Sequence, residues 1–381
     1  MENKYWNLYG NQYDLEEFID KHPGGSFILN STRGINDITA LFESYHAFSN
    51  IEKYRITLNK YLIKKDNYKN KYDFEKYNEL VDLVKKKFPN NYSIKANMYY
   101  FLIIFAMLYS YINIAYSLLF NNISPYYKTC LVILFGINHK ALMFNILHDS
   151  SHYAIFKNPS YNVFLSKISN SLHLWNNKLW NKHHIIHHHS DTGTKDDPDS
   201  YLYKLKNNKS FLLTNFMYMF LPGQHLAQSI FYVLGLYVKN PNSYDIYDLI
   251  IISFKIYFLY RLKFLYACIY LFTLNVLYFI NIFPNHSLYE TKVLNKYEGN
   301  DWLKLQIHNS GNFFNNNRFW TILFGGINYQ IEHHLFPNVS NIHLPEISKI
   351  VRKYCNDNNI PYVNINSVYG IFESLYNYIQ N

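Results

Sequence analysis

Cysteine is scarce in this chain, whose 381 residues include only Cys130, Cys268 and Cys355. These residues lie far apart and form no C-x-x-C pair, so the sequence indicates neither a disulfide framework nor a thiolate metal site. This pattern is typical of a reducing, cytosol-facing environment. A cleavable signal peptide is also lacking, because no basic segment followed by an apolar one occurs among the first residues. We therefore expect membrane insertion to depend on internal segments.

Acidic residues are outnumbered by basic ones, which gives a formal net charge of +9, and no nucleic-acid-binding motif accompanies that charge. The lysines and arginines are scattered along the chain. They fit phospholipid head groups better than nucleic acid. We expect a lipid partner and no nucleic-acid partner.

Apolar segments are abundant, and aromatic residues make up 19% of the chain. One pair of segments occupies 98–120 and 130–147, and a second occupies 249–260 and 264–283. The segment 98–120 is about long enough to cross a bilayer. We expect two membrane hairpins, about four transmembrane helices, and every histidine cluster on one side of the membrane. The broken apolar segment 211–238 is predicted to lie along the interface.

The N-terminal part is polar and contains His22-Pro-Gly-Gly25, followed 24 residues later by His46. Two histidines on separate elements can approach a haem iron from opposite faces, and such a six-coordinate haem carries electrons without binding oxygen. This pairing resembles the cytochrome b5 haem domain. The resemblance implies an α+β domain at residues 1–65 that binds haem b, with His22 and His46 as axial ligands. A linker and interfacial helix are expected at 66–97.

Three further histidine clusters follow. On an α-helix, residues three or four positions apart share one face. Each cluster therefore offers a row of nitrogen ligands, and together they can enclose two metal ions. Imidazole binds several metals, but an electron-carrying domain is of no use to zinc, so iron is expected. The predicted ligands are His148 and His152, then His184, His187 and His188, then Gln330, His333 and His334.

We predict separate roles for several other residues, most of them near these clusters. Asp149 and Glu332 are predicted to accept hydrogen bonds from the imidazoles and orient them; each can instead be a solvated carboxylate. His183 could begin the second cluster in place of His184, and His308 is a second-choice ligand. His139, His173, His225 and His343 are interpreted as structural or interfacial residues.

The same clusters resemble the three histidine boxes of the membrane fatty-acid desaturases, specifically the front-end desaturases with a fused cytochrome b5 domain. Glutamine at position 330, where other branches have histidine, is similar to the front-end pattern. The resemblance implies that His286 is a further ligand. It also implies that 98–381 form an all-α membrane domain of about four transmembrane helices under a cytosolic helical cap.

For function, the resemblance implies a front-end fatty-acyl desaturase. Such an enzyme uses O2, two non-haem irons and electrons from its haem to insert a cis double bond between an existing double bond and the carboxyl end. The substrate is a membrane lipid or an acyl-CoA, and cytochrome b5 reductase is the expected electron donor. The implied location is the endoplasmic reticulum membrane, with the N-terminus and histidine boxes cytosolic.

Three alternatives remain open from the sequence. A sphingoid-base desaturase shares the whole layout, and a lipid hydroxylase uses the same metal pair. A membrane haem electron carrier whose histidine clusters hold no iron is an alternative of another class.

Overall fold

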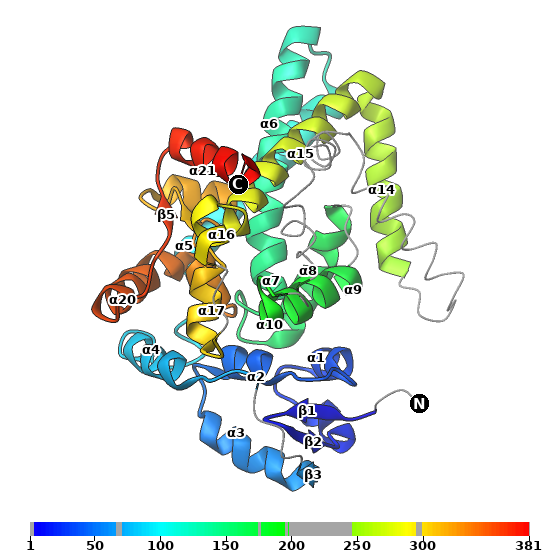
Figure 1. The fold of residues 1–381 in the computed structure, drawn as a ribbon. Coiled ribbons are helices and arrows are strands. Elements are labelled where there is room, and N and C mark those ends of the chain that lie inside the picture. The colour runs from blue at the N-terminus through cyan, green and yellow to red at the C-terminus, as the bar shows by residue number, and fades with distance from the viewer. Residues whose placement is uncertain are drawn as a thin grey trace.

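The computed structural model describes residues 4–65, 71–173, 177–194, 197, 246–294 and 299–380. The helix expected at 211–238, and His225 within it, lie outside the described residues. A small mixed domain at the N-terminus is followed by a helical domain, which confirms the predicted fold class (Figure 1).

The N-terminal domain is built on an antiparallel sheet with strand order β1-β2-β3. Trp6 and Leu8 point inward from β1, with Tyr13 of β2, because alternate residues of a strand face the same side. Short helices pack on this sheet. The elements are β1 (Trp6–Leu8), β2 (Asn11–Tyr13), η1 (Glu16–Lys21), α1 (Ser26–Thr32), α2 (Thr39–His46), α3 (Ile51–Leu58), η2 (Asn59–Tyr61) and β3 (Leu62–Lys65).

Three helices of the described part of the chain are long and apolar enough to cross a membrane. They are α5 (Met98–Phe120), α6 (Pro125–Met143) with its continuation to Ser151, and α15 (Phe264–His286) with its continuation to Thr291. The expected fourth span corresponds to α14 (Ile246–Leu262), whose 17 described residues extend about 26 Å, against a hydrocarbon core of about 30 Å. Figure 1 shows the turn between α14 and α15 at the end far from the N-terminal domain, where α6 begins.

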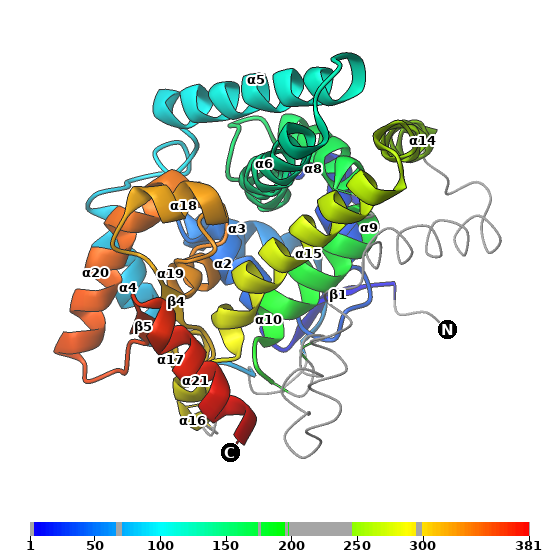
Figure 2. The same ribbon diagram turned by 90° about the horizontal axis from the view of Figure 1, so that it is seen from above.

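Helix α6 is the centre of this bundle. Of the most apolar segment of α6 and its continuation, two-thirds of the residues are buried. The corresponding share in α5 is 6%, and Phe105 and Tyr109 of that helix are exposed. Such exposure is expected of a helix that faces lipid. In Figure 2, α5 lies along one side of α6, and α15 passes along another. Gly136 permits the approach of α15, because a Cβ there would lie 2.8 Å from Cγ2 of Thr273.

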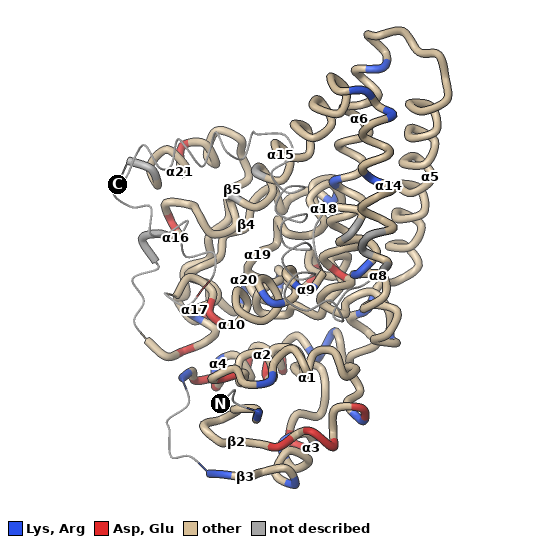
Figure 3. Tube along the Cα trace, turned by 90° about the vertical axis from the view of Figure 1, so that its right-hand side faces the viewer, with Lys and Arg blue, Asp and Glu red and all other residues tan. Residues whose placement is uncertain are grey.

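The end of the bundle that faces the N-terminal domain is covered by short helices. Charged residues gather at this end and on the N-terminal domain, while the long helices carry few (Figure 3). The remaining described elements of the helical domain are α4 (Glu75–Lys85), η3 (Phe144–His148), α7 (Asp149–Ser151), α8 (Pro159–Leu172), α9 (Asn177–Trp180), η4 (Asn181–His188), α10 (His189–Asp191), α16 (Tyr289–Leu294), α17 (Trp302–His308), β4 (Asn312–Phe313), α18 (Arg318–Phe324), α19 (Gln330–Leu335), η7 (Asn341–His343), α20 (Leu344–Asp357), β5 (Asn364–Ile365) and α21 (Val368–Gln380).

Two hydrophobic clusters contain residues of both domains. Ala47 and Phe48, just after α2, are buried in the same cluster as Phe336, which follows α19. The rings of Phe48 and Phe336 have their centroids 5.7 Å apart. Ile186 of η4 is in turn buried in the core of the N-terminal domain. This packing holds the N-terminal domain against the histidine-bearing helices.

Candidate metal centre and haem ligands

Seven imidazoles gather in two buried groups at the end of the bundle. Within each group the ligand nitrogens all lie within 4.8 Å of one another, a spacing at which they can share one ion. The first group is His148, His152, His184 and His333, and the second is His188, His286 and His334. The members come from α6 and its extension, η4, the end of α15, and α19, so the fold brings together residues far apart in the sequence.

The nitrogens that face into the groups lie close to one another or to Gln330. Nε2 of His184 lies 3.2 Å from Nε2 of His148, and Nε2 of His152 has no hydrogen-bond partner although it is buried. In the second group, the side-chain nitrogen of Gln330 lies 2.9 Å from Nε2 of both His286 and His334. Buried polar atoms normally have partners, so the orphaned Nε2 of His152 and the close approach of the other nitrogens fit metal ions that would bind them.

The opposite nitrogen, Nδ1, is anchored in several of these histidines. His188 contacts the carboxylate of Asp197 at 3.0 Å, and His286 donates to the carbonyl of Asn309 at 2.7 Å. His334 lies 3.0 Å from the side-chain oxygen of Gln306. Such contacts fix the ring orientation and leave Nε2 for the metal.

The structure does not bring the predicted His187 into either group. It is half-buried, and its electrostatic neighbours are Lys182, Asp191 and His183. His189, which was not predicted, is buried instead, with Nε2 3.0 Å from Nε2 of His333. Its ring centroid lies 4.6 Å from that of His152 and 4.4 Å from that of His334, so it stands between the two groups.

The type of helix explains why His189, and not His187, lies among the grouped histidines. The prediction assumed α-helical spacing, in which residues i, i+3 and i+4 share a face. Residues Asn181–His188 form a π-helix, whose hydrogen bonds run from i to i+5. In this wider helix, His184, His188 and His189 share a face, and His187 turns away.

The hydrogen-bond partners of Asp149 and Glu332 also differ from those predicted. Asp149 accepts hydrogen bonds from Ser340 Oγ and the Asn341 backbone, at 3.0 and 2.9 Å. Glu332 accepts from Asn312 Nδ2 at 2.8 Å and Tyr362 Oη at 2.7 Å. Both carboxylates join chain segments around the groups, and within the described part of the chain neither accepts a hydrogen bond from an imidazole.

The other histidines lie outside the two groups. Neither His183 nor His308 belongs to them among the described residues. His139 is buried in the bundle, where Nδ1 lies 3.0 Å from Oη of Tyr270, and Nδ1 of His173 lies 3.4 Å from Nε2 of His139. His343 contacts the carbonyl of Lys95 at 2.9 Å. These positions agree with structural roles for the three residues.

Burial favours the neutral form of several grouped imidazoles. It lowers the pKa of His152, His184 and His333 well below the ordinary value, and neighbouring imidazoles act in the same direction. The neutral form is the one that binds a metal ion. Burial also raises the pKa of Glu332 to about 7, against the lowering effect of its hydrogen bonds from Tyr362 and Asn312.

His22 and His46 face each other in the N-terminal domain, with ring centroids 6.3 Å apart. Two metal–nitrogen bonds of about 2 Å, together with the distance from each nitrogen to the centre of its ring, would require a similar separation of the centroids. The Nδ1 atoms donate elsewhere, from His22 to the Gly25 carbonyl at 3.1 Å and from His46 to the Phe42 carbonyl at 2.8 Å. At Gly24 a Cβ would lie 2.7 Å from the His22 ring, so glycine leaves room for that ring. The pair fits a haem.

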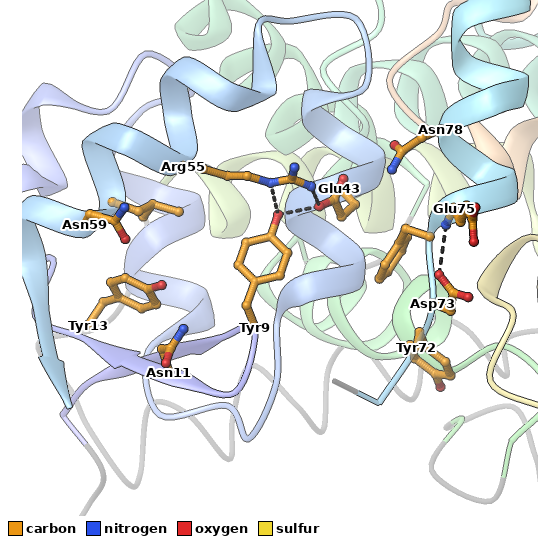
Figure 4. A pocket seen from close by; sticks show the side chains of 12 residues that line it. Tyr9, Asn11, Tyr13, Glu43, Arg55, Asn59, Tyr72, Asp73, Glu75 and Asn78 are labelled. Atoms are coloured by element: carbon orange, nitrogen blue, oxygen red, sulfur yellow. Dashed lines mark hydrogen bonds and ion pairs between the residues drawn. The ribbon is translucent and has the colours of Figure 1, made fainter. Parts of the chain in front are cut away.

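A polar cleft of about 460 Å³ lies between the N-terminal domain and the segment leading into α4. In Figure 4, Arg55 points toward Tyr9 and Glu43 across this cleft, while Asp73 and Glu75 line the other side. The lining includes neither haem-ligand candidate nor any grouped histidine. The cleft is therefore separate from both sites.

Comparisons with known proteins agree with this arrangement. The model of the cytochrome b5-like haem/steroid binding domain matches residues 2–67, and the fatty acid desaturase model matches residues 122–366. A protein named probable Delta(5) fatty acid desaturase C, from Dictyostelium discoideum, is 25% identical and aligns over 100% of this chain and 92% of its own length.

Two further relatives are named acyl-lipid desaturases. The acyl-lipid (7-3)-desaturase of Chlamydomonas reinhardtii is 28% identical over 93% of this chain and 75% of its own. The acyl-lipid (8-3)-desaturase of Mortierella alpina is 25% identical over 96% and 90%. Because the desaturase model covers more than half of the residues, the chain belongs to the fatty acid desaturase family and carries a cytochrome b5-like domain at its N-terminus.

Proposed function

We propose that this protein is a front-end acyl desaturase that inserts a cis double bond between an existing double bond and the carboxyl end of an acyl chain. The observation that carries the proposal is the pair of buried histidine groups with a haem-binding domain packed directly against them. An electron carrier alone has no use for such groups. The relatives named as Delta(5) and acyl-lipid desaturases support the front-end assignment.

We assign one non-haem iron to each group. His148, His152, His184 and His333 would hold the first, and His188, His286 and His334 would hold the second. Gln330 lies against two members of the second group, and His189 lies between the groups. Iron supplies, with O2 and electrons, the oxidising power that an unactivated C–H bond requires and that no side chain provides.

The protein's own contribution is position and exclusion of water. The anchors on Nδ1, such as Asp197 and Gln306, hold the imidazoles in fixed orientations. Every member of the two groups except half-buried His184 is buried. The ions would therefore sit at the end of the membrane helices, where an acyl chain in the bilayer can reach them.

The electron supply and location follow from the same assignment. The haem held by His22 and His46 would receive electrons from a cytochrome b5 reductase. We propose residence in the endoplasmic reticulum membrane, with the N-terminal domain and the histidine groups on the cytosolic side. The substrate is an acyl chain carried by a membrane lipid or by coenzyme A.

The test is expression in a host that is fed defined polyunsaturated chains, with double bonds located in the extracted fatty acids. A new cis bond on the carboxyl side of an existing one is expected. The variant His333→Ala should abolish this product and leave the haem spectrum unchanged. An alcohol would instead indicate a hydroxylase, and a new double bond in the long-chain base would indicate a sphingoid-base desaturase.

Metal content separates the enzyme from a simple electron carrier. Because the structure has two histidine groups, about two non-haem irons per haem are expected in the purified protein. Protein that holds haem, gains no further iron when reconstituted and forms no product would overturn the proposal.

A further inference from the structure

Helix α2 of the haem domain ends with two neighbouring residues that face different sites. His46, its last residue, faces His22 across the haem position. Tyr45 faces the desaturase domain, where its hydroxyl lies 2.6 Å from Nδ1 of His152. The two rings are stacked, with an angle of 16° between their planes. One side chain of the haem domain therefore touches a member of the first metal group.

The position of this contact on the imidazole is informative. Nε2 of His152 is buried and without a hydrogen-bond partner, so it is the nitrogen left for a metal. Nδ1 then carries the hydrogen and donates it to the tyrosine oxygen. His188 and His334 obtain the corresponding anchors from Asp197 and Gln306 of their own domain. His152 obtains its anchor from the haem domain.

The backbone of Tyr45 is held in place as well. Asn338, which follows the third histidine cluster, donates from Nδ2 to the Tyr45 carbonyl at 2.9 Å. The neighbouring Phe48 is buried against Phe336. The contact with His152 thus lies within a packed interface.

We propose that Tyr45 is the point at which electrons pass from the haem to the metal groups, and that it is also the positioning residue that orients His152. The route runs from His46 through one peptide unit to Tyr45, and across one hydrogen bond to His152. This inference rests on the proposed function, because it requires haem in one domain and iron in the other.

The electron balance is simple. In each transfer one electron would pass from a ferrous haem, held by His22 and His46, to the iron that the first group would hold. Two transfers, two protons and one O2 accompany the removal of two hydrogens from the acyl chain, and two water molecules result. The reductase supplies the electrons that return the haem to the ferrous state.

The experiment uses the full-length protein loaded with haem and iron. The haem is reduced without oxygen and then mixed with substrate and O2, and its reoxidation is followed by absorbance. Tyr45→Leu removes both the ring and the hydroxyl, whereas Tyr45→Phe removes the hydroxyl alone. Tyr354→Phe is the matched control, because its hydroxyl donates to Glu79 at 2.8 Å, away from both sites.

We expect Tyr45→Leu to slow haem reoxidation by about tenfold or more, as is usual when the outer partner of a metal-binding histidine is lost. Tyr45→Phe should show a smaller slowing. The haem spectrum, the haem potential and the rate of haem reduction should stay at parental values in both variants, and Tyr354→Phe should match the parent throughout. Equal reoxidation rates in Tyr45→Leu and parent would overturn the inference.

Two further measurements separate the possible failures. If Tyr45→Leu loses its iron, the positioning role is supported and the route is judged on Tyr45→Phe, which keeps the ring. Iron-loaded Tyr45→Phe that reoxidises its haem at the parental rate would then overturn the route. A small reduced mediator that reaches the metal groups directly should restore product in Tyr45→Leu, and its failure to do so would also contradict the route. Absence of product from the parent protein would instead count against the proposed function.

Discussion

Two histidines two positions apart, His187 and His189, have different surroundings in the fold. His189 lies among buried imidazoles from both metal groups, while His187 is half-buried beside Lys182 and Asp191. The sequence shows an unbroken run of histidines from 187 to 189 and therefore does not rank them. Only the shape of the helix decides which of them faces inward.

The residues that anchor the imidazoles were also outside the reach of sequence reasoning. Gln306 and Asn309 have no local pattern that links them to histidines, and the side chain of Gln306 contacts His334, 28 residues away. The clusters themselves could be predicted, because their spacing is local. Their hydrogen-bond partners could not, because those pairs exist only after folding.

His189→Ala and His187→Ala form a matched pair of variants. We expect His189→Ala to lower iron content and to abolish product, since it removes an imidazole that lies between the groups. His187→Ala should keep both iron and product. Measurement of iron per haem in the purified proteins decides the matter, and loss of iron in His187→Ala with retention in His189→Ala would contradict the π-helical assignment.

At the scale of elements, the turn after η4 sets the position of Asp197. Gly193 donates its backbone N–H to the Asp197 carboxylate at 2.7 Å, and the same carboxylate contacts His188. Gly193 has φ +71°, a conformation that favours glycine. A Cβ at this position would lie 2.3 Å from Cγ of Asn309, so the turn also needs glycine for space.

Gly193→Ala is expected to destabilise the protein by about 1–3 kcal/mol, the usual range for a strained backbone position, with loss of iron from the second group. Thermal unfolding in detergent and iron analysis measure both effects. The double variant with Asn309→Ala should recover part of the stability, because it removes the atoms that the new methyl group would meet. Full parental stability in Gly193→Ala would show that the turn adapts easily.

Helix α20 is tied to the segment after α4 by a small ion-pair network. Glu346 contacts Nζ of Lys87 at 2.5 Å and Nζ of Lys349 at 2.8 Å. Hydrogen bonds from Lys349 and Lys87 lower the pKa of Glu346 to about 2. Because the folded pKa lies below the unfolded one, the network stabilises the fold above about pH 4.5 and loses that effect as the pH falls toward 2.

Glu346→Gln should therefore lower the unfolding temperature slightly at pH 7, by the equivalent of less than about 1 kcal/mol, because the pair is partly exposed and screened by solvent. The difference from the parent should shrink as the pH drops below about 4.5, and also in high salt. Unfolding curves across this pH range, at two salt concentrations, provide the test. A difference that grows on acidification would have the wrong sign.

At the scale of the whole molecule, the sequence predicts two domains but not how they meet. The small α+β domain and the helical domain both follow from local patterns, and so does the existence of the apolar helices. The interface depends on single side chains, such as Phe48 against Phe336, that no periodicity marks. The count of spans depends on α14, of which the structure describes 17 residues.

Phe48→Ala is expected to weaken docking of the haem domain, since removal of a buried phenylalanine side chain costs about 3–5 kcal/mol. Amide hydrogen exchange should increase in α2 and in the segment after α19, and haem reoxidation should slow, while the haem spectrum stays unchanged. Ile56→Ala is the control, because Ile56 is 64% exposed. Unchanged exchange in both segments would mean that other contacts hold the domains together.

The two π-helical stretches, Phe144–His148 and Asn181–His188, each hold one residue more than an α-helix would use over the same rise. That surplus residue determines which histidine faces inward. If a single-residue deletion at Ile185 or Ile186 lets this stretch become α-helical, the present His188 and His189 will stand three and four positions after His184. The same three side chains would then still share a face, so the chain should tolerate this deletion better than an insertion at the same place.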